Sequence, residues 1–222
     1  MILTPEEADL YYKLHWALLA HAARRLDIFP PTHTVKDILA LHTTERKMEL
    51  REAVYADPNA LESFIAENPE AFPPDELSIV ASWRHRVSGD FYIVRYWKRY
   101  TIFLHAAEPE RLYAVLGLRD PIEEIFAGRP LPIYVRAVLL PFKDKIVYDG
   151  LLTTYNVFFG GGIQSSVKET YNRLKRQEGF IEQLTGPDGE PQVRTSLDRR
   201  TRRKPPSDRK PVVDETVTQD EM

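Results

Sequence analysis

The chain has 222 residues, of which 43% are hydrophobic and 28% charged, and its formal net charge is -3. This composition is typical of a globular protein with one or two domains, and the charge excludes a protein that coats nucleic acid over its whole surface. The sequence contains no cysteine, which excludes disulfide bonds, thiol catalysis and cysteine-ligated zinc.

The N-terminal sequence indicates neither a secretory signal nor a membrane anchor. The start, MILTPEEADLYYK, is acidic where a signal peptide would be basic, and the apolar run WALLAHAA is too short to cross a bilayer. We therefore expect a cytoplasmic protein that does not contact a membrane.

Residues 1–85 are expected to form a helical layer. Thr4 and Glu7 have the spacing of a capping box, with Pro5 at the first helical position, so a long helix begins here. Three further helices are expected: Thr34–Ala56, a short one after Asp57 and Pro58, and one after Pro73 and Pro74 that runs to about Arg84.

Residues 86–184 are expected to form a small β domain with a C-terminal helix, which makes the whole chain α+β. β-branched and aromatic residues dominate from residue 87 onward, and helical spacing disappears. Five strands are expected: Phe91–Trp97 and Tyr100–His105 as a hairpin, Arg111–Leu116, and two more around the turn at Lys143 and Asp144. Short strands with close connections predict an antiparallel meander, closed or nearly closed as an SH3-like barrel.

Residues 185–222 are expected to be a disordered, charged tail, because this segment has almost no large apolar side chains to bury. Its first part is basic and its last twelve residues carry only acidic charges. A cluster of cations in the basic part is a candidate for binding an anionic partner: Arg199, Arg200, Arg202, Arg203 and Lys204.

Three consecutive glycines, Gly160, Gly161 and Gly162, stand between a strand-like run and a helix-like run. They are not followed by the lysine and hydroxyl of a Walker A loop, and no sequence remains for the second parallel strand of a dinucleotide fold. We expect a corner that uses positive φ angles, with Ser166 and Glu169 as a second capping box. The alternative is an anion site at the helix start, with Lys168 or Arg173 nearby.

The segment FYIVRYWKRYTIF interleaves cations with aromatic residues, as small β domains that bind single-stranded nucleic acid do. The candidate binding residues here are Arg95, Tyr96, Trp97, Lys98 and Arg99. Aromatic residues are also good strand formers, and a basic hairpin tip also protects a sheet edge from aggregation, so this alternative stays open.

Other catalytic and metal-binding patterns are missing from the sequence. The six histidines do not have the spacing of metal ligands, and the serines lack the G-x-S-x-G elbow of hydrolases. Asp149, beside Gly150, is interpreted as a bulge or turn residue rather than a catalytic acid. The sequence therefore indicates no cofactor and no catalytic residue.

The block VRAVLLPFKDKIVYDGLL, followed by FGGGIQSSVKETYNRLK, resembles a block in uncharacterised bacterial proteins, some of which end in a cysteine-rich SEC-C-type zinc motif. This chain has no cysteine and carries a charged tail in place of that motif. The resemblance implies a bacterial origin and supplies no catalytic residue.

These observations together predict a non-enzymatic interaction protein that binds a protein or an RNA. The alternative is an enzyme or binding protein for a phosphorylated or otherwise anionic small ligand at Gly160–Gly162.

Overall fold

The computed structural model describes residues 1–28, 44–155, 157, 159–184 and the backbone of 192–194. Within these residues the chain is mixed helix and sheet, which confirms the expected α+β class. The cation cluster at 199–204, most of the predicted tail and the first half of the predicted second helix lie outside them.

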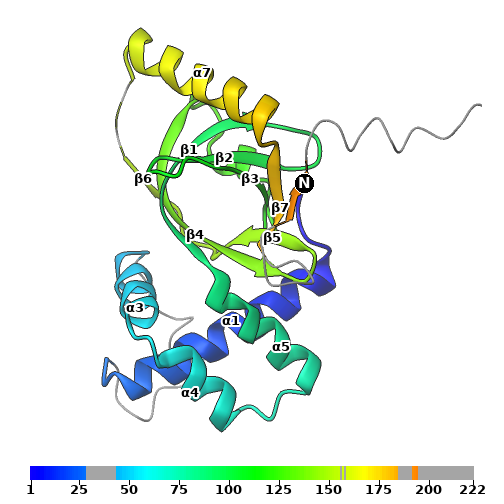
Figure 1. Ribbon diagram of the computed structural model, residues 1–222. Coiled ribbons are helices and arrows are strands. Elements are labelled where there is room, and N and C mark those ends of the chain that lie inside the picture. The colour runs from blue at the N-terminus through cyan, green and yellow to red at the C-terminus, as the bar shows by residue number, and fades with distance from the viewer. Residues whose placement is uncertain (29–43, 156, 158, 185–191, 195–222) are drawn as a thin grey trace, which may run out of the picture.

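The helices of the first 85 residues gather on one side of the sheet, and a later helix lies across the opposite end (Figure 1). In chain order the helices are α1 (Pro5–Arg25), α3 (Thr44–Ala56), α4 (Ala60–Glu67), α5 (Pro74–Ser82), the 3-10 turn η1 (Trp83–His85), α6 (Ile122–Ile125) and α7 (Gly161–Gln177). Each lies close to where the sequence predicts a helix, apart from α6, which occupies the acidic connection after the third strand.

The start of α1 follows directly from the local sequence. The Thr4 hydroxyl accepts a hydrogen bond from the Glu7 amide, and the Glu7 carboxylate accepts one from the Thr4 amide, which completes the predicted capping box. The helix then buries Tyr11, Leu14 and Leu18, so its inner stripe faces the sheet and the other helices.

Eight strands form one sheet in the order β2-β1-β4-β5-β3-β7-β8, with β6 beside β4 and a further pairing of β2 with β3. Their bounds are β1 (Val87–Tyr96), β2 (Thr101–His105), β3 (Leu112–Leu116), β4 (Ile133–Phe142), β5 (Lys145–Tyr148), β6 (Thr153–Thr154), β7 (Phe180–Gln183) and β8 (Gln192–Arg194). The predicted hairpin and the tight turn between β4 and β5 are both present. Residues 192–194, expected to belong to the disordered tail, pair with β7.

The predicted antiparallel, SH3-like barrel is wrong in two respects. β1, β2 and β3 do form an antiparallel meander, but β3 pairs in parallel with both β5 and β7, so the sheet is not antiparallel throughout. The sheet is also not a true barrel. β5 pairs with Val115 and Leu116 of β3, and β7 pairs with the same strand at Tyr113. Strand patterns report which face is buried, and they do not report which strands are neighbours.

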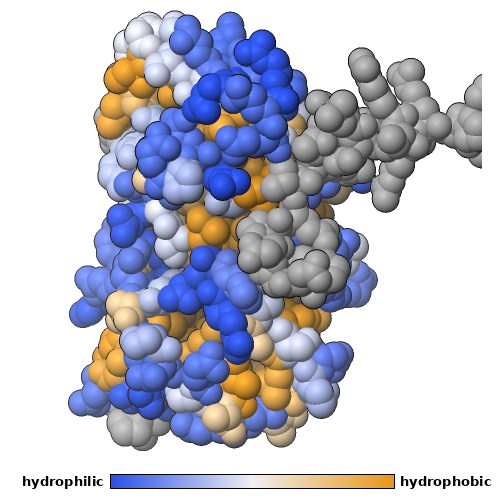
Figure 2. Space-filling view, viewed as in Figure 1, coloured by the Kyte–Doolittle hydropathy of each residue, from blue (hydrophilic) through white to orange (hydrophobic). Residues whose placement is uncertain are grey.

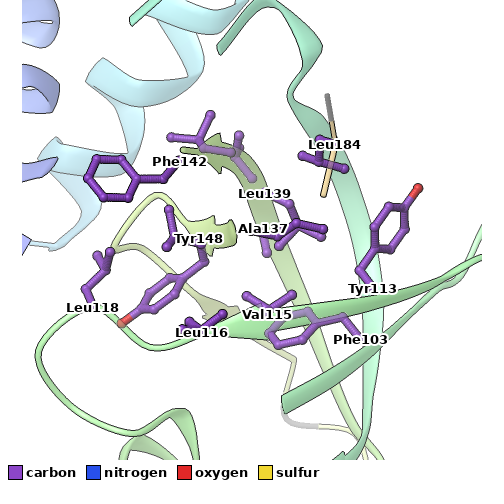
Figure 3. Close-up of a cluster of buried hydrophobic side chains, with 14 of the residues drawn as sticks. Phe103, Tyr113, Val115, Leu116, Leu118, Ala137, Leu139, Phe142, Tyr148 and Leu184 are labelled. Carbon is purple, nitrogen blue, oxygen red and sulfur yellow. The ribbon is translucent and has the colours of Figure 1, made fainter. Parts of the chain in front are cut away.

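The core lies where the curled sheet encloses its own inward-facing side chains. Figure 3 shows Phe103, Val115, Leu139 and neighbouring side chains from β2, β3 and β4 pointing toward one another. The core continues to the helices, because the Trp83 indole is fully buried and donates a hydrogen bond to the Pro141 carbonyl on β4 at 3.1 Å. The sheet thus has one buried side and one outer face on which other residues are presented.

Candidate functional site

The aromatic residues of the predicted hairpin site are packed against the protein itself. The Trp97 ring meets the Phe180 ring edge-on, with 4.7 Å between centroids, and the Lys175 ammonium lies 5.6 Å from the Trp97 ring. The Tyr96 hydroxyl is buried, and burial raises the pKa of Tyr96 to about 12. The Trp97 ring therefore fixes the hairpin to β7 and α7, and the Tyr96 hydroxyl is buried, so neither ring stands free as a stacking platform.

The cations of the same hairpin are presented to solvent. Arg95, Lys98 and Arg99 are all exposed, and the turn is closed by a hydrogen bond of 2.8 Å from the Trp97 amide to the Tyr100 carbonyl. The structure thus separates the two halves of the predicted site: its charges are accessible, and its aromatic rings are engaged.

The three glycines form the start of α7 without the expected backbone conformation. Gly160 is the N-cap residue with φ -65°, and among the described residues the glycines with positive φ are Gly128, Gly150 and Gly179. The expectation of positive φ at Gly160, Gly161 and Gly162 is therefore wrong. The helix begins early enough to place Ser166 in its second turn, so Ser166 and Glu169 cannot form the expected capping box.

The glycine corner is open to solvent and has no side-chain cap. A Cβ atom added at any of the three glycines would meet nothing within 4 Å, and the first amides of α7 have no side-chain acceptor. Lys168 is exposed, and Arg173 pairs with Glu110 instead of facing the corner. The corner therefore offers an anion only the free backbone amides found at any helix start. Neither Lys168 nor Arg173 adds a positive charge at this point.

Replacing Gly162 with alanine is expected to stabilise the protein by about 0.4–1 kcal/mol, since the helical backbone already suits alanine and the unfolded chain loses freedom. The matched control is Gly150, where φ is +91° and alanine is expected to be destabilising. Chemical denaturation measures both. A loss of stability in the Gly162 variant would restore the positive-φ interpretation.

Four aromatic rings form a group on the outer side of β1 and β4, here called the aromatic face: Tyr92, Tyr134, Tyr155 and Phe159. Along β1, Phe91 is buried and Tyr92 points outward; along β4, Val135 is buried and Tyr134 points outward. Antiparallel register pairs Tyr92 with Tyr134, and their ring centroids are 4.9 Å apart. This alternation of buried and outward side chains is what a strand with one solvated side imposes.

The chain after β6 completes the aromatic face by continuing beside β4. The Tyr155 amide donates to the Tyr134 carbonyl at 3.3 Å, which places the Tyr155 ring 4.9 Å from the Tyr134 ring. Phe159 follows, with its ring 5.6 Å from Tyr92 and 6.2 Å from Tyr134. Tyr134 is therefore the centre of the group and contacts the other three rings.

A pocket of about 190 Å³ opens at this face. It is lined by Arg129 and the segment up to Tyr134, and by Tyr155, Val157, Phe159 and Gln164. Val157 and Ile163 nearby are about half exposed, and Figure 2 shows apolar surface beside the beginning of α7, whose remaining turns are mostly hydrophilic in this view. The glycine corner and the aromatic face are thus neighbours in space.

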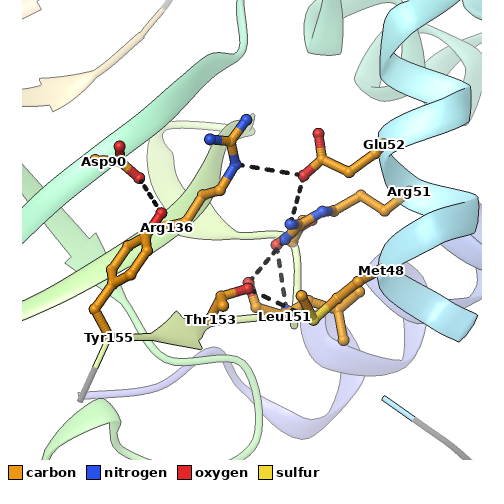
Figure 4. Close-up of polar contacts among 9 residues, drawn as sticks. Met48, Arg51, Glu52, Asp90, Arg136, Leu151, Thr153 and Tyr155 are labelled. Carbon is orange, nitrogen blue, oxygen red and sulfur yellow. Dashed lines mark hydrogen bonds and ion pairs between the residues drawn. The ribbon is translucent and has the colours of Figure 1, made fainter. Parts of the chain in front are cut away.

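Polar side chains border the aromatic face on the side of α3 (Figure 4). The Tyr155 hydroxyl donates to Asp90 at 3.0 Å, and Asp90 pairs in register with Arg136 on β4. The Arg136 Nε lies 3.6 Å from a carboxylate oxygen of Glu52 on α3. The outer face of the sheet therefore carries aromatic rings in its middle and an ionic group at its edge.

This ionic group continues inward to a buried ion pair, Arg51 with Asp149. Both side chains are almost fully buried, the Arg51 Nη1 lies 3.3 Å from the Asp149 carboxylate, and Arg51 also donates to the Leu151 carbonyl. Burial raises the pKa of Asp149 to about 7, while the Arg51 charge and the Leu151 amide act in the opposite direction. Asp149 is thus neither a simple turn residue nor solvated; it ties α3 to the end of β5.

Further buried polar groups surround this pair. Within the described residues, no hydrogen-bond partner is present for the Tyr11 hydroxyl, the Tyr55 hydroxyl, the His15 Nδ1 or the Arg51 Nε. Burial lowers the pKa of His15 to about 3, with the Arg51 charge acting in the same direction. His15 therefore stays neutral at physiological pH, stacked on Tyr11.

Neither a metal-ligand cluster nor a membrane-spanning helix is found among the described residues. They contain no group of three His, Asp or Glu side chains that could hold a metal ion. No helix among them combines the length and the apolar character needed to span a bilayer.

Sequence reasoning missed Tyr92, Tyr134, Tyr155 and Phe159 as one group. The alternation in PIYVRAV indicates that Tyr134 and Arg136 share the solvated side of a strand. The aromatic residues of TTYNVFF stand just before the glycines. No pattern in the sequence indicates that the second segment lies beside the first, because that contact depends on tertiary structure.

Comparison with known proteins finds no matching family model, curated protein or solved structure. The resemblance of the block between Val135 and Lys175 to bacterial proteins stays a prediction.

Proposed function

We propose that this chain is a cytoplasmic, non-enzymatic binding protein whose partner is single-stranded RNA, held on the aromatic face. The observation that carries the proposal is the group of four rings around Tyr134, which is partly exposed and borders a pocket. Bases stack on such rings with little regard to sequence, because every base has a π face.

The size of the pocket favours part of a polymer over a whole small molecule. Sites for small molecules usually measure about 300–1,000 Å³, and this pocket measures about 190 Å³. It accommodates one ring-sized group, while the rest of a longer ligand lies on the open sheet. A single-stranded RNA has this form, with one base in the pocket and its neighbours outside.

The cations near the aromatic face suit a phosphate backbone. Arg129 lines the pocket, and Arg136 lies two residues from Tyr134 on the same side of β4. Arg95 lies three residues from Tyr92 on β1, about 10 Å at roughly 3.3 Å per residue, and Lys98 and Arg99 follow in the turn after β1. In this proposal the RNA backbone extends from the aromatic face to the basic hairpin. The hairpin cations bind phosphate groups, and the aromatic face stacks on the bases.

The anion-site alternative at Gly160–Gly162 has weaker support. It depends on the free amides of one helix start, and no buried polar group among the described residues points there. A protein partner would use the same aromatic face, and it is the outcome to pursue if RNA does not bind.

Replacing Tyr134 with alanine is expected to weaken RNA binding by about 1–3 kcal/mol, because it removes the ring that the other three contact. Fluorescence anisotropy with labelled single-stranded oligonucleotides at low salt measures the affinity. Tyr12→Ala, which removes a half-buried tyrosine of α1, is the matched control and is expected to bind like wild type.

Thermal melting establishes that both variants are folded. Failure of the wild-type protein to bind any single-stranded RNA at low salt would refute the proposed function. Equal affinity of Tyr134→Ala and wild type would show that RNA binds at another surface.

A further inference from the structure

Arg136 is presented beside the aromatic face, and it already has a partner. Its guanidinium Nε lies 3.6 Å from the Glu52 carboxylate, and each of these side chains is about half exposed, at 49% and 51%. Half exposure leaves room for a phosphate to approach Arg136. The Glu52 carboxylate therefore competes with an RNA phosphate group for the positive charge of Arg136.

Glu52 is held in this position from its other side. The same carboxylate oxygen accepts a hydrogen bond of 2.8 Å from Arg51 Nη2, and the Arg51 side chain is 1% exposed. Arg51 in turn is fixed by Asp149 and the Leu151 carbonyl (Figure 4). An exposed glutamate normally moves among several rotamers, whereas this one is tied to a buried and immobile group.

We infer that Glu52 tunes RNA binding at the aromatic face, because it limits how strongly Arg136 pairs with a phosphate group. This inference rests on the proposed RNA-binding function. A phosphate binds Arg136 by displacing Glu52, and Glu52 then keeps its bond to Arg51. Because Glu52 offsets the charge of Arg136, RNA binding depends mainly on base stacking. The contribution from phosphate contacts is smaller than the number of nearby arginines would indicate.

Neutralising Glu52 is expected to release Arg136. Glu52→Gln should bind single-stranded RNA about two- to fivefold more tightly at low salt, which corresponds to the strength of an exposed ion pair. The slope of log affinity against log salt concentration should also steepen, by at most about 0.7, because Arg136 then makes its phosphate contact in a larger fraction of the complexes. Arg136→Gln should weaken binding, and adding Glu52→Gln to Arg136→Gln should change nothing further.

Glu49→Gln is the matched control, since Glu49 lies one turn earlier on α3, is exposed and pairs with Arg46. It removes the same charge from the same helix without touching Arg136. Anisotropy titrations at four salt concentrations are measured for wild type and all variants, with thermal melting to establish folding.

The outcomes separate the two proposals. Wild-type binding that depends on Tyr134, with Glu52→Gln no tighter than Glu49→Gln, would overturn the inference and leave the proposed function intact. No binding by wild type or by Glu52→Gln would overturn both. Tighter binding and a steeper slope in Glu52→Gln alone, lost in the double variant, is the result that we expect.

Discussion

Replacing Arg51 with methionine is expected to lower the free energy of unfolding by about 3–5 kcal/mol, because it leaves the Asp149 carboxylate buried without its counter-charge. The loss should be smaller at pH 5 than at pH 8. Without Arg51 the pKa of Asp149 rises further, so the carboxyl group is protonated and neutral at the lower pH. Urea denaturation at both pH values measures the difference.

The double variant Arg51→Met/Asp149→Asn is expected to recover most of this stability, since it removes both charges and keeps an acceptor for the Leu151 amide. Arg46→Met, at a position on α3 where the side chain is 68% exposed, is the control and is expected to stay within about 0.5 kcal/mol of wild type. If Arg51→Met is as stable as wild type, the pair does not hold α3 on the sheet.

Replacing His15 with phenylalanine is expected to protect the protein against acid. The folded-state pKa of His15, about 3, is depressed from its ordinary value of 6.5, so the stability that this residue contributes is present above pH 6.5. That stability is lost as the pH falls toward 3. Phenylalanine keeps the aromatic contacts with Tyr11 and Trp83 and cannot take up a proton. Relative to wild type, the variant should gain on the order of 4 kcal/mol between pH 6.5 and 3.5.

The stability contribution of Asp149 should depend on pH in the opposite direction to that of His15. Its folded-state pKa of about 7 is raised from 3.8, so its contribution is fully present below pH 3.8 and is lost as the pH rises through 7. Asp149→Asn should therefore become less stable relative to wild type as the pH falls from 7 to 4. Urea denaturation across this range tests both variants. Parallel pH profiles for wild type and His15→Phe would contradict a buried, neutral histidine.

Local sequence signals were sufficient for the elements whose formation is local. The capping box at Thr4 and Glu7 set the start of α1, and the turn at Lys143, which adopts φ +54°, joined β4 to β5 as expected. The stripe of Val167, Tyr171 and Leu174 on α7 is buried, whereas Ile163, predicted to belong to it, is 49% exposed. Ile163 lies in the first turn of the helix, where the glycines before it are also exposed.

The pairing of strands and the candidate site depend on contacts between distant segments. Arg51 and Asp149 are separated by 98 positions, and an arginine followed by a glutamate on a helix gives no sign of burial. Tyr96 and Trp97 appeared to be free rings because their sequence shows an interleaved pattern, whereas the contact between Trp97 and Phe180 depends on where β7 returns. The parallel pairing of β3 with β5 could not be predicted either, because a strand's pattern is the same for both neighbour directions.

Ultraviolet cross-linking of the full-length protein to single-stranded RNA, followed by mass spectrometry of the linked peptides, tests the central claim most directly. We expect links at Tyr92, Tyr134, Tyr155 or Phe159, because bases that stack on these rings lie against them, and we expect them to be reduced in Tyr134→Ala. Links confined to residues 194–210, or no links at all, would contradict binding at the aromatic face.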